Sequence, residues 1–157
     1  MRKNKITFSF DLDGFIADGH HWFFKIIDTI RQSNPKLARI AELEYYTSRP
    51  LKFHPNLFLA SGDKGFILTA RKPMSQKITK SWLKRYGINL PIIFIDKKGD
   101  IDWHDHIKAS TQSARLKAKA IKKLKIDVHF DNNPTIVKRL REEFGIKAIL
   151  VGGEEEI

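Results

Sequence analysis

Two carboxylates stand close together near the start of the chain, in the segment Phe10-Asp11-Leu12-Asp13-Gly14. Carboxylate oxygens suit Mg²⁺, a hard cation that binds one or two of them together with substrate phosphate. A carboxylate can also act as a nucleophile and form an aspartyl-phosphate. The alternative is a turn in which both side chains only accept from backbone amides. Because the pair directly follows an apolar stretch, the pattern favours the chemical interpretation, with Asp11 and Asp13 as catalytic and metal-binding candidates.

A hydroxyl group and a cation follow a second apolar stretch, at Leu68-Thr69-Ala70-Arg71. A hydroxyl followed by backbone amides that enter a helix forms a binding site for anions. The guanidinium of Arg71 adds bidentate contacts to a phosphate. Thr69, Ala70 and Arg71 are therefore candidate phosphate-binding residues. The alternative is that Thr69 only caps the helix predicted from Pro73.

A third polar group, Asp131 and Asn132, lies just before Asn133 and Pro134. A carboxylate at this place can serve as a further ligand of the cation held by Asp11. The alternative is structural, because Asn ahead of Pro is also typical of the start of a helix.

A basic segment precedes this third group and supplies a candidate for charge neutralisation. A lysine that contacts the transferred phosphate offsets the negative charge that develops in the transition state. Spacing alone does not select the residue, and a solvated helix face explains most of the charge equally well. The basic residues are Arg115, Lys117, Lys119, Lys122, Lys123 and Lys125.

Hydrophobic periodicity predicts alternating strands and helices around these groups. The predicted strands are Ile6–Phe10, Gly65–Leu68, Pro91–Ile95, Ile126–Phe130 and Ile146–Val151. The predicted helices are His20–Gln32, Lys36–Tyr46, Pro73–Tyr86, Gln112–Leu124 and Pro134–Phe144, with an irregular loop at Lys97–Ile107. This order predicts an α/β fold, a Rossmann-like three-layer sandwich with a mainly parallel sheet. Ligands of such sheets bind beyond the carboxyl ends of the strands, where the polar groups described above are expected.

Composition limits the remaining classes. The 157 residues fit one domain, 1–157, and 41% hydrophobic residues suffice for a core. The absence of cysteine excludes disulfides and thiolate metal sites. No apolar segment is long enough to cross a bilayer, and no signal peptide is evident, so we expect a cytoplasmic protein without a membrane partner. The net charge of +11 favours phosphate-rich partners, nucleic acid among them.

Together the motifs resemble those of the haloacid dehalogenase-like (HAD) hydrolase superfamily, in the same order, from Ile6 to about Val151. The resemblance assigns one residue or segment to each motif: Phe10–Gly14 with Asp18 to the first, Thr69 to the second, Lys117 (Lys119 as second choice) to the third, and Asp131 to the fourth. The fourth motif commonly has two adjacent acids, and Asn132 replaces the second one here. The segment Leu68–Arg71 with Trp82 and Leu83 looks most like the nucleotidase-like phosphatases.

The resemblance implies a mechanism. Asp11 would attack the phosphorus of a phosphomonoester and form an aspartyl-phosphate. Asp13 would protonate the leaving oxygen and then take a proton from the hydrolytic water. Mg²⁺ would be held by Asp11, the Asp13 carbonyl and Asp131, while Asn132 would ligate it, contact a metal-bound water or orient Asp131. Thr69 and Lys117 would hold the phosphate oxygens.

The resemblance also makes residues 15–64 a small helical cap inserted after the first strand. The segment is rich in aromatic residues, which are Phe15, Trp22, Phe23, Phe24, Tyr45, Tyr46 and Phe53. We expect most of them to form the core of the cap and its contact with the main domain. The alternative is that one or two, with Tyr45 and Tyr46 the candidates, stack on a nucleobase.

Asp102-Trp103-His104-Asp105-His106 has the composition of a metal cluster but no regular spacing. We expect exposed loop residues here, with contact to the rim of the substrate site as the alternative.

Three functions fit the sequence. The first is a Mg²⁺-dependent phosphatase acting on a nucleotide or another small phosphate ester. The second is a phosphatase acting on the 3′ or 5′ ends of nucleic acids. The third is a phosphate- or nucleic-acid-binding protein that no longer catalyses.

Overall fold

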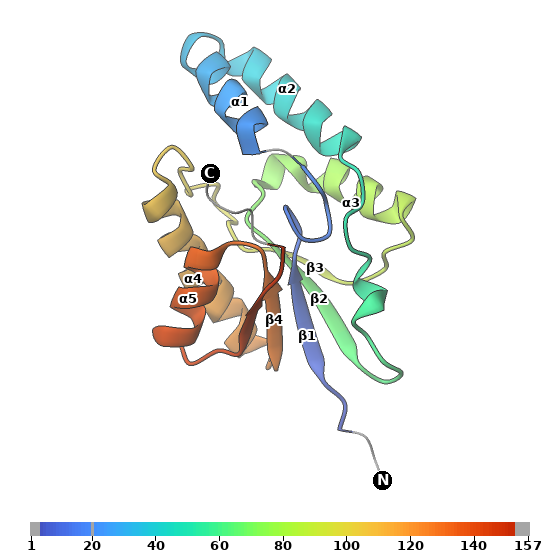
Figure 1. Cartoon of the computed structure of the whole chain (residues 1–157). Helices are drawn as coiled ribbons and strands as arrows, with labels where there is room; N and C mark the ends of the chain where they lie inside the picture. The colour runs from blue at the N-terminus through green and yellow to red at the C-terminus, as the bar shows by residue number, and fades with distance from the viewer. Residues whose placement is uncertain (1–3, 20, 153–157) are drawn as a thin grey trace.

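A parallel five-stranded sheet forms the centre of the molecule (Figure 1). The computed structural model describes residues 4–19 and 21–152. The strands are β1 (Thr7–Asp11), β2 (Lys64–Thr69), β3 (Ile92–Phe94), β4 (Val128–Asp131) and β5 (Ala148–Leu150). Their order in the sheet is β3-β2-β1-β4-β5, and every neighbouring pair is parallel. This order confirms the predicted α/β fold and places β1, which carries Asp11, in the middle.

Helices connect the strands, as the sequence pattern predicts. They are α1 (His21–Ser33), α2 (Pro35–Ser48), α3 (Gln76–Arg85), α4 (His106–Lys123) and α5 (Pro134–Glu142), with short 3₁₀ turns η1 (Pro55–Leu57) and η2 (Pro73–Ser75). Polar caps set where two of them begin. Asn34 accepts from the Leu37 amide at the start of α2, with Pro35 in the first turn, and Asn133 accepts from the Thr135 and Ile136 amides at the start of α5. None of the described helices is long and apolar enough to cross a membrane.

The largest difference from the sequence prediction is the start of α4. The loop was predicted to run to Ile107 and the helix to begin at Gln112, but α4 begins at His106, where Asp105 accepts from the Lys108 amide. The buried face of the helix is mostly small or polar, with Ala109, Ser110 and Ser113 near its start. A hydrophobic-periodicity test misses such a face, because it detects apolar side chains.

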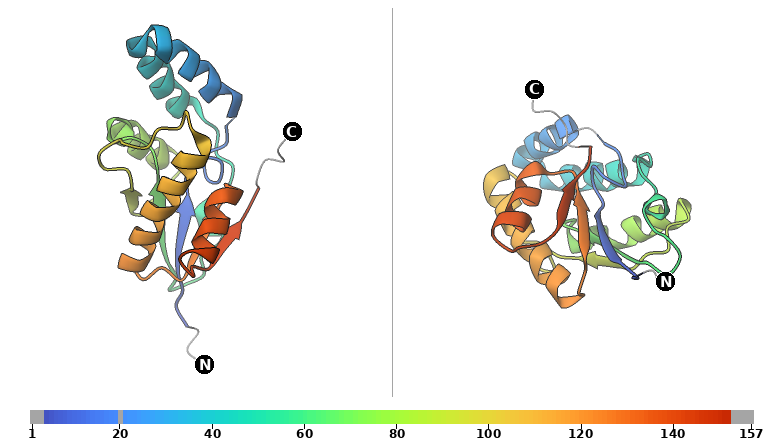
Figure 2. Two further views of the ribbon diagram at one scale, coloured as in Figure 1. Left: turned by 90° about the vertical axis from the view of Figure 1, so that its left-hand side faces the viewer. Right: turned by 60° about the horizontal axis from the view of Figure 1, so that its bottom comes forward.

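Two cores cover the two faces of the sheet. Alternation along β1 directs Phe8 and Phe10 to one face, where Phe10 stacks on Phe130 with ring centroids 5.5 Å apart. The helix α3 covers this face, and α4 and α5 pack on the other one, as the right-hand view of Figure 2 shows. Asp11 follows Phe10 in the alternation and therefore points to the α4 side. The arrangement is the predicted three-layer sandwich.

The helices α1 and α2 form a hairpin that protrudes beyond the carboxyl ends of the strands (Figure 1). Within the segment 15–64, this hairpin is the part that protrudes, and we call it the cap. Phe15 is fully buried in the main core, and Phe53 and Phe58 pack against it. Phe15 and Phe53, two of the seven aromatic residues of the segment, therefore contribute to the main core. His20 and the side chains of Trp22 and Phe24 lie outside the described residues.

Candidate active site

Three charged side chains meet at the carboxyl ends of β1 and β4. The Lys117 ammonium, on α4, donates to Asp11 Oδ1 at 2.8 Å and to Asp131 Oδ2 at 2.6 Å. The side chain of Lys117 is 2% exposed and that of Asp131 is 0% exposed. The structure thus brings Lys117 into the site, whereas Lys119, the second choice, is exposed. We call Asp11, Lys117 and Asp131 the sheet cluster.

The sheet cluster holds more negative than positive charge, and this imbalance affects Asp11 most. Burial and repulsion by Asp131 raise the pKa of Asp11 from 3.8 to about 7, although Lys117 acts in the opposite direction. Burial also favours the neutral form of Asp131, but Lys117 and His129 outweigh it and hold the Asp131 pKa well below its usual range. A further positive charge beside Asp11 would therefore stabilise its ionised form.

A buried histidine, His129, supports the sheet cluster and lies outside the motifs that the sequence predicts. His129 is adjacent to Ser9 in the β1–β4 register, with Ser9 Oγ 2.7 Å from His129 Nδ1. Its other nitrogen, Nε2, lies 3.1 Å from Asp131 Oδ2. Burial lowers the pKa of His129, which favours the neutral ring with Nε2–H donating to Asp131. Strand alternation predicts this position from the sequence, because it directs Ser9 and Asp11 of one strand, and His129 and Asp131 of the other, to one face of the sheet.

Oxygen atoms suited to a divalent cation converge beside Asp11. The outer end of the Asn132 carboxamide lies 3.0 Å from Asp11 Oδ2 and 3.1 Å from the carbonyl oxygen of Asp13. With its nitrogen at this place, Asn132 donates to both oxygens. With its oxygen there, three oxygens face one another, and a cation is needed to stabilise them.

The spacing of these oxygens fits magnesium. Octahedral Mg²⁺ has ligands at about 2.0–2.1 Å, which puts neighbouring ligand oxygens about 3 Å apart. Gly14 makes the approach of Asn132 feasible, because its φ is +87° and an added Cβ would lie 2.0 Å from the Asn132 amide. Within residues 4–19 and 21–152, no cluster of three or more His, Cys, Asp or Glu side chains could hold a metal ion. The candidate magnesium ligands are instead one carboxylate, one main-chain carbonyl and one side-chain amide.

The second carboxylate of the motif, Asp13, is held by two arginines. Arg71 donates from Nε to Asp13 Oδ2 at 2.9 Å and from Nη2 to Oδ1 at 2.6 Å. Arg49 also donates to Asp13 Oδ1. Burial alone would raise the pKa of Asp13, but the two guanidinium groups outweigh it and lower the pKa to about 2. We call Asp13, Arg49 and Arg71 the hinge cluster.

The phosphate contact predicted for Arg71 is not the arrangement in the structure. Besides its two bonds to Asp13, the guanidinium donates to Thr79 Oγ1 at 3.0 Å and lies over the Tyr46 ring at 3.9 Å from its centroid. The side chain is 1% exposed. Asp13 thus neutralises the guanidinium in this arrangement, and a contact of Arg71 with phosphate stays a prediction.

Arg49 ties Asp13 to both segments that connect the cap to the sheet. Its guanidinium donates to the Asp18 carbonyl at 2.6 Å and to the Ala17 carbonyl at 3.0 Å. The carbonyl of Arg49 itself accepts from the Trp82 indole at 2.7 Å. The local sequence around Arg49 carries no signal for this role, since its partners lie 31 to 36 positions away.

The other residues that the sequence analysis singled out, Thr69, Ala70 and Asn133, lie at three separate places around the site. Thr69 is 1% exposed and its hydroxyl accepts from the Arg71 amide at 3.2 Å, so it shapes the turn after β2. It does not cap α3, whose first residue follows Ser75. Ala70 lines the cavity described next. Asn133 caps α5, as the structural alternative proposed, and its amide also donates to Ser110 Oγ at 3.3 Å.

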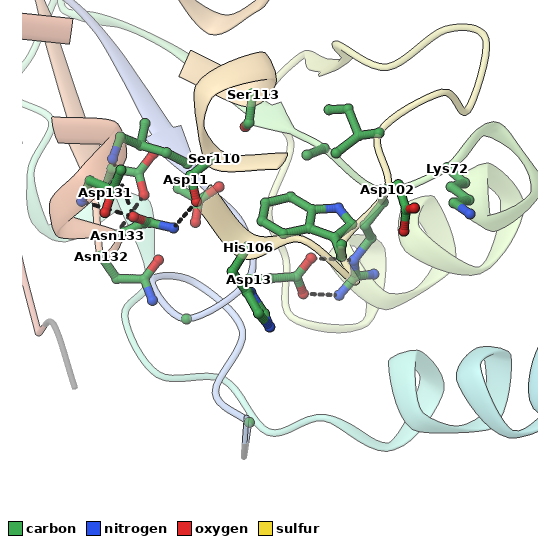
Figure 3. Close-up of a pocket in the computed structure, with 18 of the residues that line it drawn as sticks. Asp11, Asp13, Lys72, Asp102, His106, Ser110, Ser113, Asp131, Asn132 and Asn133 are labelled. Carbon is green, nitrogen blue, oxygen red and sulfur yellow. Dashed lines mark hydrogen bonds and ion pairs between the residues drawn. The ribbon is translucent and has the colours of Figure 1, made fainter. Parts of the chain in front are cut away.

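A cavity of about 620 Å³ lies between the cap and the ends of the strands, and both clusters line it (Figure 3). The cap contributes Lys25, Asp28, Arg31, Glu42, Tyr45 and Tyr46. Tyr45 stacks on Phe23 with centroids 4.2 Å apart, and Tyr46 packs against Arg71, so each of these rings already has a face in use. The segment 102–106 is mostly exposed, as expected, but Asp102, Trp103 and His106 also line the cavity, which agrees with the alternative of a rim contact.

No protein-family model and no curated protein matches the sequence. Solved structures do match the fold. One is a chain in the structure of the Pnkp1/Rnl/Hen1 RNA repair complex, with a TM-score of 0.62, 16% identity, and coverage of 96% of this chain and 43% of that chain. The present chain therefore spans less than half the length of that neighbour.

Two shorter neighbours match over most of both chains. The first is a HAD-superfamily hydrolase from Geobacter sulfurreducens PCA, with a TM-score of 0.55, 8% identity, and coverage of 97% of this chain and 89% of that chain. The second is a HAD family enzyme from Bacteroides thetaiotaomicron in complex with magnesium and inorganic phosphate, with a TM-score of 0.51, 14% identity, and coverage of 98% and 97%. The chain therefore has a HAD-like fold. The nucleotidase-like branch stays a prediction.

Proposed function

We propose that this protein is a Mg²⁺-dependent phosphatase that hydrolyses phosphomonoesters with Asp11 as the nucleophile. The observation that carries the proposal is the close grouping of Asp11 Oδ2, the Asp13 carbonyl and the end of the Asn132 carboxamide at magnesium spacing, with Lys117 on the other carboxylate oxygen of Asp11. A HAD-like fold with neighbours that include an enzyme in complex with magnesium and phosphate adds support.

Asp11, the Asp13 carbonyl and Asn132 would hold the cation, and Asp131 would add its charge beside them. Both carboxylate oxygens of Asp131 already accept hydrogen bonds, from the Asn133 amide, Lys117 and His129. When bound, Mg²⁺ supplies positive charge to the phosphate oxygens and favours the ionised form of Asp11. Asn132 brings no charge, so the site relies on Asp11 and Asp131 for its attraction to the cation.

The side chains divide the chemistry between the two clusters. Asp11 Oδ attacks phosphorus, the bond from phosphorus to the leaving oxygen breaks, and Lys117 offsets charge on the phosphoryl group. Asp13 passes a proton to the leaving oxygen and later takes one from the water that cleaves the aspartyl-phosphate. The arginines hold Asp13 ionised in the free protein, so it is ready for the second role. For the first role, Asp13 must gain a proton as the contacts to Arg49 and Arg71 loosen.

Phosphate release from a substrate panel, with and without Mg²⁺, tests the proposal for wild type and Asp11→Asn. The panel contains an aryl phosphate, 5′- and 3′-mononucleotides, sugar phosphates and phosphate-ended oligonucleotides. We expect Mg²⁺-dependent release in wild type and a loss of at least about a thousand-fold in the variant. Near-normal turnover by folded Asp11→Asn would contradict the role of Asp11. Mg²⁺ binding without release from any substrate would favour a binding protein.

A second candidate is a phosphatase that acts on nucleic-acid ends. The net charge of +11 favours a polyanionic substrate, and the fold is shared with a chain of an RNA repair complex. Preference for an oligonucleotide terminus over a mononucleotide, with turnover that falls steeply as salt rises, would support this candidate. Equal turnover of both substrates at all salt concentrations would contradict it.

A further inference from the structure

One wall of the cavity is a single face of α4. His106, Ser110, Ser113 and Lys117 all line the cavity and recur every three or four residues, which places them on one side of a helix. Figure 3 shows Ser113, Ser110 and His106 following one another along this wall. With a rise of 1.5 Å per residue, Ser113 and Ser110 lie about 6 and about 10 Å before Lys117 along the helix axis. Its Lys117 end contacts Asp11, so the rest of the wall extends away from the reacting centre.

The hydroxyl group of Ser113 has no hydrogen-bond partner among the described residues. The residue is 0% exposed. Ser113 lies one helical turn before Lys117 on the same face of α4, so their side chains are neighbours. Buried polar groups in native proteins nearly always have a partner, and one without a partner in a cavity wall indicates that a ligand supplies it.

Trp103 precedes α4 in the chain and lines the same cavity. It is half-buried and lies with its ring 6.4 Å from that of His106. The loop that carries it has a fixed shape, because the Asp96 carboxylate accepts from the Asp100 and Ile101 amides at 2.9 and 3.0 Å. Ile101, which is 2% exposed, anchors the loop in the protein. A large flat ring is thus held at the cavity rim by a preformed loop.

The same loop reaches the cap. His104 Nδ1 lies 3.9 Å from Asp28 Oδ2 on α1, and Asp28 also lines the cavity. The loop and the cap therefore enclose the cavity from two sides at its outer end. A volume of about 620 Å³ is far more than a phosphate needs and lies in the range of about 300–1,000 Å³ that holds drug-sized ligands.

We infer that the α4 wall is a subsite for a nucleoside, in which Trp103 stacks on the base and the Ser113 hydroxyl binds the sugar. This inference rests on the proposed function and names its substrate class, a phosphate ester of a nucleoside. The phosphate lies at Lys117 and Asp11, and the base lies towards the rim. A mononucleotide and the terminal nucleotide of an oligonucleotide share this chemistry.

Kinetics of two substrates test the subsite. The quantity is the ratio of kcat/KM for adenosine 5′-monophosphate to kcat/KM for ribose 5-phosphate, which lacks the base. We expect Trp103→Ala to lower this ratio about ten-fold and Trp103→Phe to retain most of it, because a ring suffices for stacking. Leu57→Ala, an exposed position away from the cavity, is the control. Ser113→Ala should lower kcat/KM for the nucleotide several-fold without lowering the Tm, which a purely structural residue would not do.

Binding separates the subsite from catalysis. Calorimetry of Asp11→Asn with the same two compounds should show tighter binding of the nucleotide, and adding Trp103→Ala should remove the difference. If wild type hydrolyses neither compound but this pattern is found, the subsite stands and the proposed function fails. If wild type hydrolyses both and Trp103→Ala changes neither ratio nor binding, the subsite is wrong and the proposed function stands. A phosphate-ended trinucleotide, added to both assays, distinguishes a free nucleotide from a nucleic-acid end.

Discussion

Asp11 and Asp13 are separated by one residue in the chain, yet they lie in opposite electrostatic surroundings. In the sheet cluster, Asp11 shares Lys117 with Asp131, and its pKa is raised to about 7. In the hinge cluster, Asp13 is bound by two arginines, and its pKa is lowered to about 2. Asp11 therefore shares one cation with a second carboxylate, whereas Asp13 is bound by two cations.

The difference suits a division of labour. A carboxylate that is short of positive charge attracts a metal ion and phosphoryl chemistry, and its ionised form is stabilised when the metal arrives. A carboxylate bound by arginines is fixed in position and ionised until those contacts change. The hinge cluster also joins the two chain segments that enter and leave the cap, so the state of Asp13 is linked to the position of α1 and α2.

The largest effect should come from removing the cation of the sheet cluster. Lys117→Met leaves two carboxylates buried without it, which should cost about 3–5 kcal/mol of unfolding free energy in metal-free protein. Turnover should fall by at least about a thousand-fold. Urea unfolding with and without Mg²⁺ and phosphate release measure both effects. Lys119→Met, on the exposed side of the same helix, is the control, and similar losses in both variants would contradict the assignment.

The pH dependence of stability should reveal the raised pKa of Asp11. Without Mg²⁺, folded protein keeps a proton on Asp11 between pH 4 and 7 that the unfolded chain releases, so this residue makes stability fall as pH rises through that window. His129 acts in the opposite direction, because its pKa is lowered.

Subtracting the wild-type curve from that of Asp11→Asn isolates the Asp11 contribution. From pH 4 to 7, the unfolding free energy of the variant should rise by a few kcal/mol relative to that of wild type. At pH 7, saturating Mg²⁺ should restore the stability of wild type. Urea unfolding at each pH measures the difference. Parallel curves in metal-free protein would show that Asp11 titrates normally.

The hinge cluster should respond more moderately. Arg71→Gln removes two bonds to Asp13 but leaves Arg49 in place, so we expect a loss of about 2 kcal/mol of unfolding free energy at pH 7. Because the Asp13 pKa is lowered, this stabilisation is fully present above pH 4 and is lost as pH falls through about 2. Arg71→Lys should recover part of it with one bond. If Arg71→Gln instead weakened only phosphate affinity, the contact predicted from the sequence would be restored.

The smallest effect should come from Asn132. Asn132→Asp adds a negative charge beside Asp11 and should strengthen Mg²⁺ binding by about ten-fold, whereas Asn132→Ala should weaken it. Calorimetric titration with MgCl₂ measures both. Weaker binding in Asn132→Asp would place the cation away from this side chain.

Much of the framework follows from local sequence patterns. The alternation of Phe8, Phe10 and their neighbours indicates β1, and Pro35 and Pro134 mark the starts of two helices. The start of α4 could not be predicted in this way, because its buried face consists of alanines and serines. His129 could have been found, since strand alternation places it beside Asp131. Arg49 could not, because a single arginine before Pro50 is typical of any surface loop.

The sequence by itself determined that Asp11, Thr69 and Asp131 lie at one edge of the sheet, because each ends an apolar strand and parallel strands end at the same edge. Only the tertiary structure decided which cation each carboxylate receives. Lys117 reaches Asp11 across 106 positions and Arg49 reaches Asp13 across 36. The choice among many basic residues depends on how α4 and the cap segments pack, and electrostatic energy falls with distance in space rather than along the chain.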